Sequence, residues 1–209
     1  MAENKNALHV FLFSTVALLP VTFFLWYVTA PYHLVMIAAP TGAIGQWLMP
    51  EAVRHVMLDG HLLTVVTQFV PGPGGQLVPD PGALLTASFK VNPLIVGFGL
   101  PLFAAMTLAA PGKGKLARLV LGLILLVPVH IACVIVDVLA HLVQVGGPAV
   151  LQMLDMGAAG YNALQLARRF TVLILPGVAP LIVWVALHRQ FLARLAPQFA
   201  SRKLARQGE

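Results

Sequence analysis

Apolar residues gather in this chain into four long runs that carry almost no charge. The runs cover residues 8–30, 93–110, 116–145 and 170–188. A helix needs roughly 20 mostly apolar residues to cross a bilayer, about 17 to 25 in practice. We therefore predict four membrane-spanning helices, the first of them an uncleaved anchor. The third run is long enough to tilt or to project beyond the hydrocarbon core.

The stretch after the first run is apolar but interrupted. It covers residues 32–50 and contains Pro40, Gly42 and Gly45. Because such residues break regular helices, this stretch is predicted to be an interfacial or a re-entrant segment rather than a fifth span.

The spacing between apolar residues then changes from the helical period to the two-residue period of strands. Residues 53–58 and 61–70 are predicted to form a hairpin through Asp59-Gly60, a pair that accepts the positive φ angles of a tight turn. The proline- and glycine-rich stretch that follows fits neither a helix nor a strand interior. Residues 83–91 are predicted to form a third strand that enters the second span. Together they predict a small antiparallel sheet.

The predicted fold is an α-helical integral membrane protein, a four-span bundle with a small antiparallel β-sheet in the outer loop between spans one and two. Its parts are then residues 1–30 (tail and span one), 31–92 (outer loop), 93–188 (spans two to four) and 189–209 (basic tail). A second outer loop is expected at residues 146–169, with a short helix around residues 149–156.

Composition supports the membrane location. Hydrophobic residues make up 59% of the chain and charged residues only 10%. Soluble domains are about 25% charged, so a water-soluble globule is excluded. The 13 Lys and Arg residues against 7 Asp and Glu do not cluster on one aqueous face, and we therefore expect no nucleic-acid partner.

The distribution of the cations indicates the orientation. With four spans, most Lys and Arg residues fall on the side of the N-terminus. Since positively charged loops resist translocation, we predict that both termini are cytoplasmic in a bacterial inner membrane. The basic tail is expected to lie along anionic lipid.

The third run carries three ionisable residues on one helical face, His130, Asp137 and His141. Asp137 and His141 are four residues apart, so they could share a transition metal, form a hydrogen bond or relay a proton. The two histidines are about 16 Å apart along the helix, too far for one ion. The favoured interpretation places Asp137 and His141 at the outer water interface and lets His130 form a hydrogen bond across the bundle; the metal site is the weaker alternative, and no cofactor is expected.

Two arginines before span four and the single cysteine are further candidates for a chemical role. Arg168 and Arg169 precede span four on the outer side, where they are expected to contact lipid phosphates, with Asp137, Asp155 or a partner's carboxylate as alternatives. The single cysteine, Cys133, excludes an intrachain disulfide and is expected to be a small buried residue rather than a nucleophile.

Two motifs carry a family resemblance. VNPLIVGFGLPLFAAMTLA (residues 91–109) precedes a short basic loop and a long third span, and ILPGVAPLIVWVALHRQFL (residues 174–192) follows them. This arrangement resembles the exosortase H-associated membrane proteins. The layout also resembles the exosortase and archaeosortase family, whose members process sorting signals with a Cys after the strands and an Arg and a His in later spans.

The residues of that transpeptidase set do not match. Asn92 stands roughly where the nucleophilic Cys would be expected, and Asp137 stands where the Arg would fall. The resemblance therefore implies a sorting-system accessory or a catalytically silent relative, with no catalytic residue carried over and Asn92 as a candidate partner contact.

The favoured function is a non-enzymatic accessory or assembly subunit that associates with the bilayer and with other membrane proteins. One alternative is an intramembrane metal-binding or enzymatic subunit that uses the polar face of span three. The other is a small oligomeric transporter, although the chain has no internal repeat.

Overall fold

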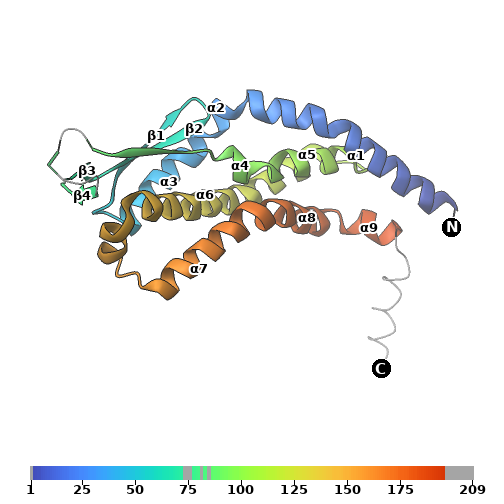
Figure 1. The fold of residues 1–209 in the computed structure, drawn as a ribbon. Coiled ribbons are helices and arrows are strands. Elements are labelled where there is room, and N and C mark those ends of the chain that lie inside the picture. Colours follow the sequence, from blue (N-terminus) through green and yellow to red (C-terminus); the bar gives the residue numbers. More distant parts are fainter. Residues whose placement is uncertain (1, 73–76, 81, 84–85, 196–209) are drawn as a thin grey trace. The chain divides into compact units, whose positions relative to one another are not determined.

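A computed structural model describes residues 2–72, 77–80, 82–83 and 86–195 of the protein (Figure 1). The chain forms two compact units. The helical unit comprises the described parts of Met1–Tyr27, Gly99–Leu126 and Val178–Glu209. The sheet unit comprises the described parts of Val28–Phe98 and Val127–Gly177.

The helical unit is built from apolar helices. They are α1 (Ala2–Val28), α5 (Gly99–Ala109), the first part of α6 (Lys115–Met153), most of α8 (Leu175–Leu187) and the short α9 (Arg189–Leu195). Aromatic side chains join three of these helices: the Phe11 ring stacks on Trp184 at 5.2 Å and lies 5.4 Å from the Phe191 ring. The basic tail beyond Leu195 lies outside the described residues.

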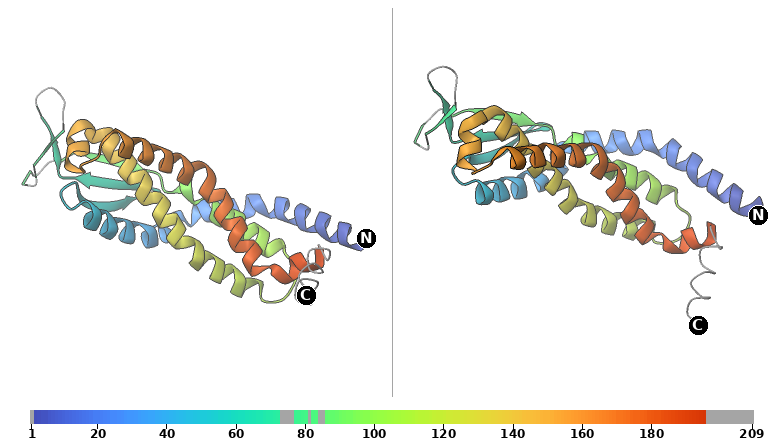
Figure 2. Two further views of the ribbon diagram at one scale, coloured as in Figure 1. Left: turned by 90° about the horizontal axis from the view of Figure 1, so that it is seen from below. Right: turned by 60° about the horizontal axis from the view of Figure 1, so that its bottom comes forward.

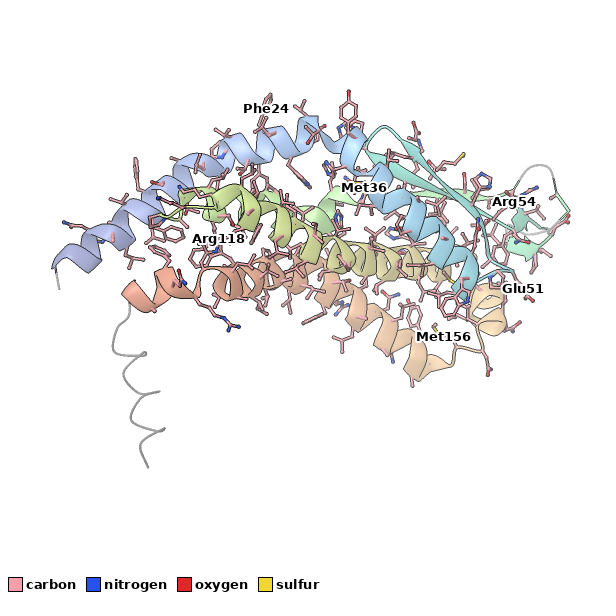
Figure 3. The ribbon with its side chains drawn as sticks, turned by 180° about the vertical axis from the view of Figure 1, so that it is seen from behind. Phe24, Met36, Glu51, Arg54, Arg118 and Met156 are labelled. Carbon is pink, nitrogen blue, oxygen red and sulfur yellow. The ribbon has the colours of Figure 1, made fainter. Side chains whose placement is uncertain are left out.

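Large apolar side chains cover the outside of these helices. Phe13 is 77% exposed and Leu116 is 71% exposed, and Phe24 points outward from α1 (Figure 3). Apolar surface of this extent is rare on soluble monomers but is normal against lipid. This surface, together with the predominance of apolar helices, confirms the prediction of a helical membrane protein.

Three helical segments are long and apolar enough to cross a membrane. They are Asn6–Val28, Lys115–Met153 and Ala158–Leu187. The predicted second span corresponds to the shorter apolar segment Leu94–Ala109, formed by α4 (Leu94–Gly97) and α5. The count of four spans therefore stays a prediction.

The sheet unit contains the predicted small antiparallel sheet. Its strand order is β1 (Val53–Asp59), β2 (Leu62–Thr67) and β5 (Ser88–Val91). Asp59 pairs with Leu62 across the turn, where Gly60 has a φ of 63°. The turn therefore consists of Gly60-His61, one position later than the predicted Asp59-Gly60, and the third strand begins only at Ser88.

The second predicted strand is shorter than expected because the chain leaves the sheet at Gln68. The Gln68 backbone N–H donates to Ala52 O, and its side-chain amide donates to Pro50 O at 2.6 Å. Beyond it, β3 (Phe69–Pro71) pairs with β4 (Leu77–Pro79) in a separate two-stranded sheet. The sequence did not predict this pair, whose prolines occupy strand ends, where a missing N–H is tolerated.

The interrupted segment after the first span is helical. It forms α2 (Ala30–His33) and α3 (Val35–Leu48), and Pro40 lies inside α3. A Cβ added at Gly42 would lie 3.5 Å from the Val56 side chain, so the small residue lets α3 approach β1 closely. The turned views show α3 running beside the strands (Figure 2). Whether this segment is interfacial or re-entrant stays a prediction.

The expected second outer loop is also largely helical. α6 continues to Met153 across a break at Gly147 (φ 56°, ψ −140°), and α7 covers Ala158–Arg169. A π-helical turn, η2 (Phe170–Ile174), joins α7 to α8. Residues 154–157, between α6 and α7, are not helical, and Asp155 there has a φ of 48°.

Candidate functional site

Three ionisable side chains of the sheet unit meet between α6 and α7. Asp137 and His141 lie one turn apart on α6, and Arg168 lies at the end of α7. The Arg168 Nε–H donates to Asp137 Oδ1 at 2.8 Å. These three residues are called the polar cluster below. Asp137 was one of the partners that the sequence left open for Arg168.

The two ring nitrogens of His141 have different hydrogen-bond partners. Its Nδ1–H donates to the backbone carbonyl of Asp137 at 2.9 Å, so Nε2 carries the lone pair. The NH2 group of the Arg168 guanidinium lies 3.2 Å from that Nε2 and donates to it. One guanidinium therefore binds the carboxylate and the imidazole together.

The ion pair between Arg168 and Asp137 is important for stability because it is largely buried. The Asp137 side chain is only 9% exposed, and that of Arg168 is 28% exposed. An isolated charge in an apolar surrounding is strongly unfavourable, whereas a hydrogen-bonded pair of opposite charges compensates much of the penalty. The cluster thus allows an acidic residue to occupy the predicted third span.

The sheet and the following helical turn support the cluster. The Phe89 ring of β5 stacks on the His141 imidazole, with centroids 6.1 Å apart and ring planes 11° from parallel. The Thr171 hydroxyl donates to the Arg168 carbonyl at 3.0 Å in the π-helical turn. These contacts connect α6, α7 and the edge strand β5.

His130 does not join the polar cluster, although it lies on the same face of α6. Its Nε2–H donates to Pro93 O at 2.9 Å, and the residue is only 3% exposed. Pro93 begins the turn into α4, where Asn92 Oδ1 accepts the Leu94 backbone N–H at 3.0 Å. His130 and Asn92 therefore both fix the junction between the sheet and the predicted second span.

The remaining sequence candidates lie elsewhere. Arg169 is exposed and borders an open apolar groove of about 500 Å³ along α7 and η2. Lipid contact of Arg169 stays a prediction. Cys133 is 1% exposed and lies between His130 and Asp137 on α6.

Residues 5–191 match the family described as exosortase H-associated membrane protein. The chain belongs to this family. No characterised protein and no solved structure matches it.

The exosortase H-associated protein holds its polar cluster by mutual hydrogen bonds. In the part of the chain that the structure describes, no three His, Cys, Asp or Glu side chains lie close enough to hold a metal ion. Asp137, the one acidic member of the cluster, binds Arg168. The arrangement is suited to bracing helices against a sheet, and none of its members is a thiol or hydroxyl nucleophile.

Sequence reasoning about this family member missed Phe89 and Thr171. The alternation of strand β5 offered a signal, because Phe89 shares a face with buried Val91 while Ser88 and Lys90 are exposed. Thr171 lies three residues after Arg168, the spacing at which a hydroxyl reaches a helical carbonyl. Neither signal identifies the partner, since Phe89 and His141 are far apart in the sequence.

Proposed function

We propose that this exosortase H-associated protein is a non-enzymatic accessory subunit of an exosortase-type protein-sorting system. It would act in the bacterial inner membrane, with both termini cytoplasmic, and hold another membrane protein. The observation that carries the proposal is the family match over residues 5–191.

The state of the candidate catalytic positions supports a non-enzymatic role. Asn92, at the position expected for the nucleophile, accepts a hydrogen bond from the Leu94 N–H at the start of α4. The single thiol, Cys133, is 1% exposed and would meet substrate only after opening of the helices. Thiol chemistry requires an accessible thiolate with a base beside it.

The free face of the sheet is the surface that we propose for the partner. α3 lies against Val56 and α6 lies against Phe89, both on one face of the sheet. The opposite face carries Met57, which is 49% exposed, and Thr64, its neighbour on β2. Strand faces that combine apolar and hydrogen-bonding side chains are suited to protein contacts.

Co-purification tests the proposal. The tagged full-length protein would be extracted in mild detergent from its native membrane, and the bound proteins would be identified by mass spectrometry. We expect a multi-pass partner with the exosortase Cys, Arg and His set to be enriched over a tag-only control. A monodisperse, partner-free preparation would contradict the proposal.

A pair of variants tests the surface. Met57→Glu places a charge on the proposed contact and should reduce recovery of the partner. Val78→Glu changes a residue of β4 that is similarly exposed, at 43%, and should leave recovery unchanged. If both variants recover the partner equally, the sheet face is not the contact surface. The proposal of an accessory role would remain.

A further inference from the structure

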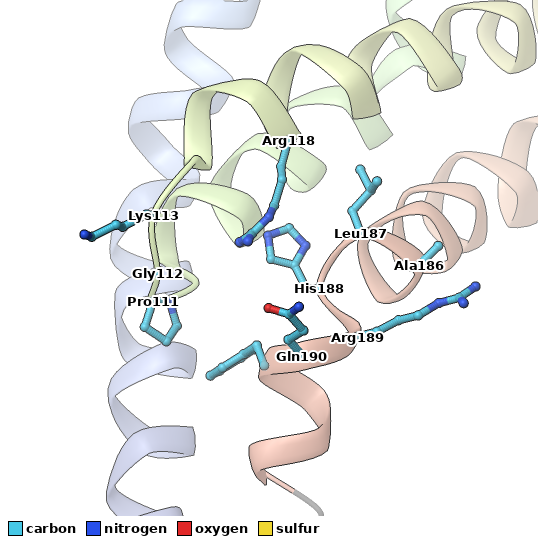
Figure 4. A pocket seen from close by; sticks show the side chains of 10 residues that line it. Pro111, Gly112, Lys113, Arg118, Ala186, Leu187, His188, Arg189 and Gln190 are labelled. Atoms are coloured by element: carbon cyan, nitrogen blue, oxygen red, sulfur yellow. The ribbon is translucent and has the colours of Figure 1, made fainter. Parts of the chain in front are cut away.

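The helical unit contains a pocket that the proposed function does not use. It has a volume of about 470 Å³ and lies between the α5–α6 loop, the first turns of α6 and the junction of α8 with α9 (Figure 4). The loop contributes Gly112 and Lys113, α6 contributes Arg118, and the junction contributes His188 and Arg189.

The pocket concentrates positive charge. Lys113, Arg118 and Arg189 line it, and none of its ten described lining residues is acidic. None of the three forms an ion pair with a carboxylate in the described part of the chain. Only 10% of the residues in this chain are charged, so three cations without a carboxylate partner around one pocket are unusual. Their positive potential favours binding of an anion.

His188 supplies an independent indication of a ligand. It is only 2% exposed, its ring stacks on Trp184 at 4.9 Å, and its Nδ1–H donates to Trp184 O at 3.0 Å. The other ring nitrogen, Nε2, is buried and has no hydrogen-bond partner among the described residues. Because Nδ1 carries the hydrogen, Nε2 is an acceptor, and since buried polar atoms are nearly always paired, it is suited to a hydrogen-bond donor of a ligand in the pocket.

Figure 4 shows how the side chains are arranged. The guanidinium of Arg118 lies beside the His188 ring, and the Gln190 amide lies on the other side of that ring. Lys113 and Arg189 project away on opposite sides. Arg118 and His188 therefore form the centre of the pocket, while the two outer cations flank it.

The loop is held in a defined conformation. Gly112 has a φ of 122° and Gly114 a φ of 74°, a region that residues with side chains rarely adopt. Lys115 Nζ donates to the Leu108 carbonyl at 2.7 Å and so ties the end of α5 to the start of α6. The pocket wall is thus fixed from both ends of the loop.

We propose that this pocket binds a phosphate-bearing ligand, with Arg118 as the direct ligand of the phosphate oxygens, Lys113 and Arg189 as flanking charges, and His188 Nε2 accepting a hydrogen bond from a hydroxyl of the ligand. Guanidinium groups bind phosphate oxygens through paired, charge-assisted hydrogen bonds. Basic pockets between membrane helices are typical sites for phosphate-bearing lipid headgroups. Leu116, 71% exposed in the first turn of α6, offers apolar surface for an acyl chain. The phosphate belongs either to an anionic lipid or to a free anion.

Thermal unfolding of the purified full-length protein in detergent tests the proposal. The probes are dioctanoyl phosphatidylglycerol, inorganic phosphate and, as a zwitterionic comparison, dioctanoyl phosphatidylcholine. We expect the Tm to rise with the first or the second probe and to change little with the third. A response to phosphatidylglycerol alone identifies a lipid site, and a response to inorganic phosphate identifies a free-anion site.

Variants locate the binding. Arg118→Gln should weaken the response about tenfold in half-saturating concentration, the effect of one lost charge-assisted hydrogen bond. Lys113→Gln, on the exposed loop, should weaken it less and provides a variant that keeps the helices intact. Arg169→Gln, an exposed arginine of the sheet unit, is the matched control and should respond as wild type. No response to either anion, or equal responses in all variants, would overturn the proposal.

Discussion

At the residue scale, His130, Asp137 and His141 of the apolar span α6 each form a specific hydrogen bond. His130 donates to Pro93, His141 donates to its own helix, and Asp137 accepts from Arg168. Polar groups in an apolar surrounding remain stable only when such partners exist. The polar cluster is therefore the place where a single substitution should have the largest effect.

Arg168→Ala should lower the free energy of unfolding by roughly 2–4 kcal/mol, because it leaves the Asp137 carboxylate buried without its partner. Arg169→Ala removes an exposed arginine one position later and should change stability by less than about 0.5 kcal/mol. Thermal unfolding in detergent measures both. Equal losses for the two variants would contradict the pairing.

A double-mutant cycle separates the ion pair from general packing. If Arg168 and Asp137 act together, combining Arg168→Ala with Asp137→Asn should cost less than the sum of the two single changes. The coupling should be about 1–3 kcal/mol for contacting charged groups. Strict additivity would show that the 2.8 Å contact contributes nothing to stability.

At the element scale, an exposed ion pair links the two edge strands of the sheet. Lys90 Nζ on β5 lies 2.7 Å from Asp59 Oδ2 on β1. The hydrogen bond from Lys90, and second its charge, hold the pKa of Asp59 below its usual value. The stability from this pair is present above the usual pKa of an Asp and is lost as the pH falls through the lowered folded pKa.

Carboxyl NMR titration of Asp59 checks this direction. Lys90→Met should bring the pKa of Asp59 back up toward its usual value, and raising the salt concentration should have the same sign because the pair is exposed. Lys113→Met, a lysine of the helical unit, should leave it unchanged. A pKa that does not respond to Lys90→Met would disprove the pairing.

The packing of α5 on α6 makes a second prediction at this scale. A Cβ at Gly122 would overlap the ring of Phe103, which is fully buried. Gly122→Ala should therefore destabilise the protein by about 1–3 kcal/mol through overpacking. Gly177→Ala, in α8 with no atom within 4 Å of its added Cβ, is the control and should be neutral or slightly stabilising. A tolerated Gly122→Ala would mean that the two helices are not in close contact.

At the scale of the whole molecule, the path of Leu94–Ala109 decides the topology. This segment has 16 residues, or about 24 Å of helix, against a hydrocarbon thickness of about 30 Å. If it spans, Lys90 and Lys113 lie on opposite sides of the membrane. If it does not, they lie on the same side.

Cysteine labelling measures this directly, because the chain has one natural cysteine that can be replaced by Cys133→Ser. In intact spheroplasts, an impermeant maleimide should label Lys90→Cys and should label Lys113→Cys only after lysis. This result would establish the second span and place the sheet outside. Labelling of both positions before lysis would contradict the four-span prediction.

The sequence by itself determined the membrane class, the strand hairpin and the family resemblance. These features depend on local information: long apolar runs, an Asp-Gly pair between alternating residues, and two contiguous motifs. The same local reasoning placed Asp137 and His141 on one face of a helix. It did not predict the helices α3 and α7 as such, and the assignments of residues 32–50 to an interfacial or re-entrant segment and of residues 146–169 to an outer loop stay predictions.

Only the tertiary structure decided which of these residues meet. Arg168 is 31 positions from Asp137, and no local pattern selects Asp137 over Asp155 as its partner. The basic pocket likewise joins a glycine loop to a helix junction more than 60 residues later. Periodicity fixes the face on which a side chain lies, but the helix and strand that come to lie against that face are set by the packing of the whole unit.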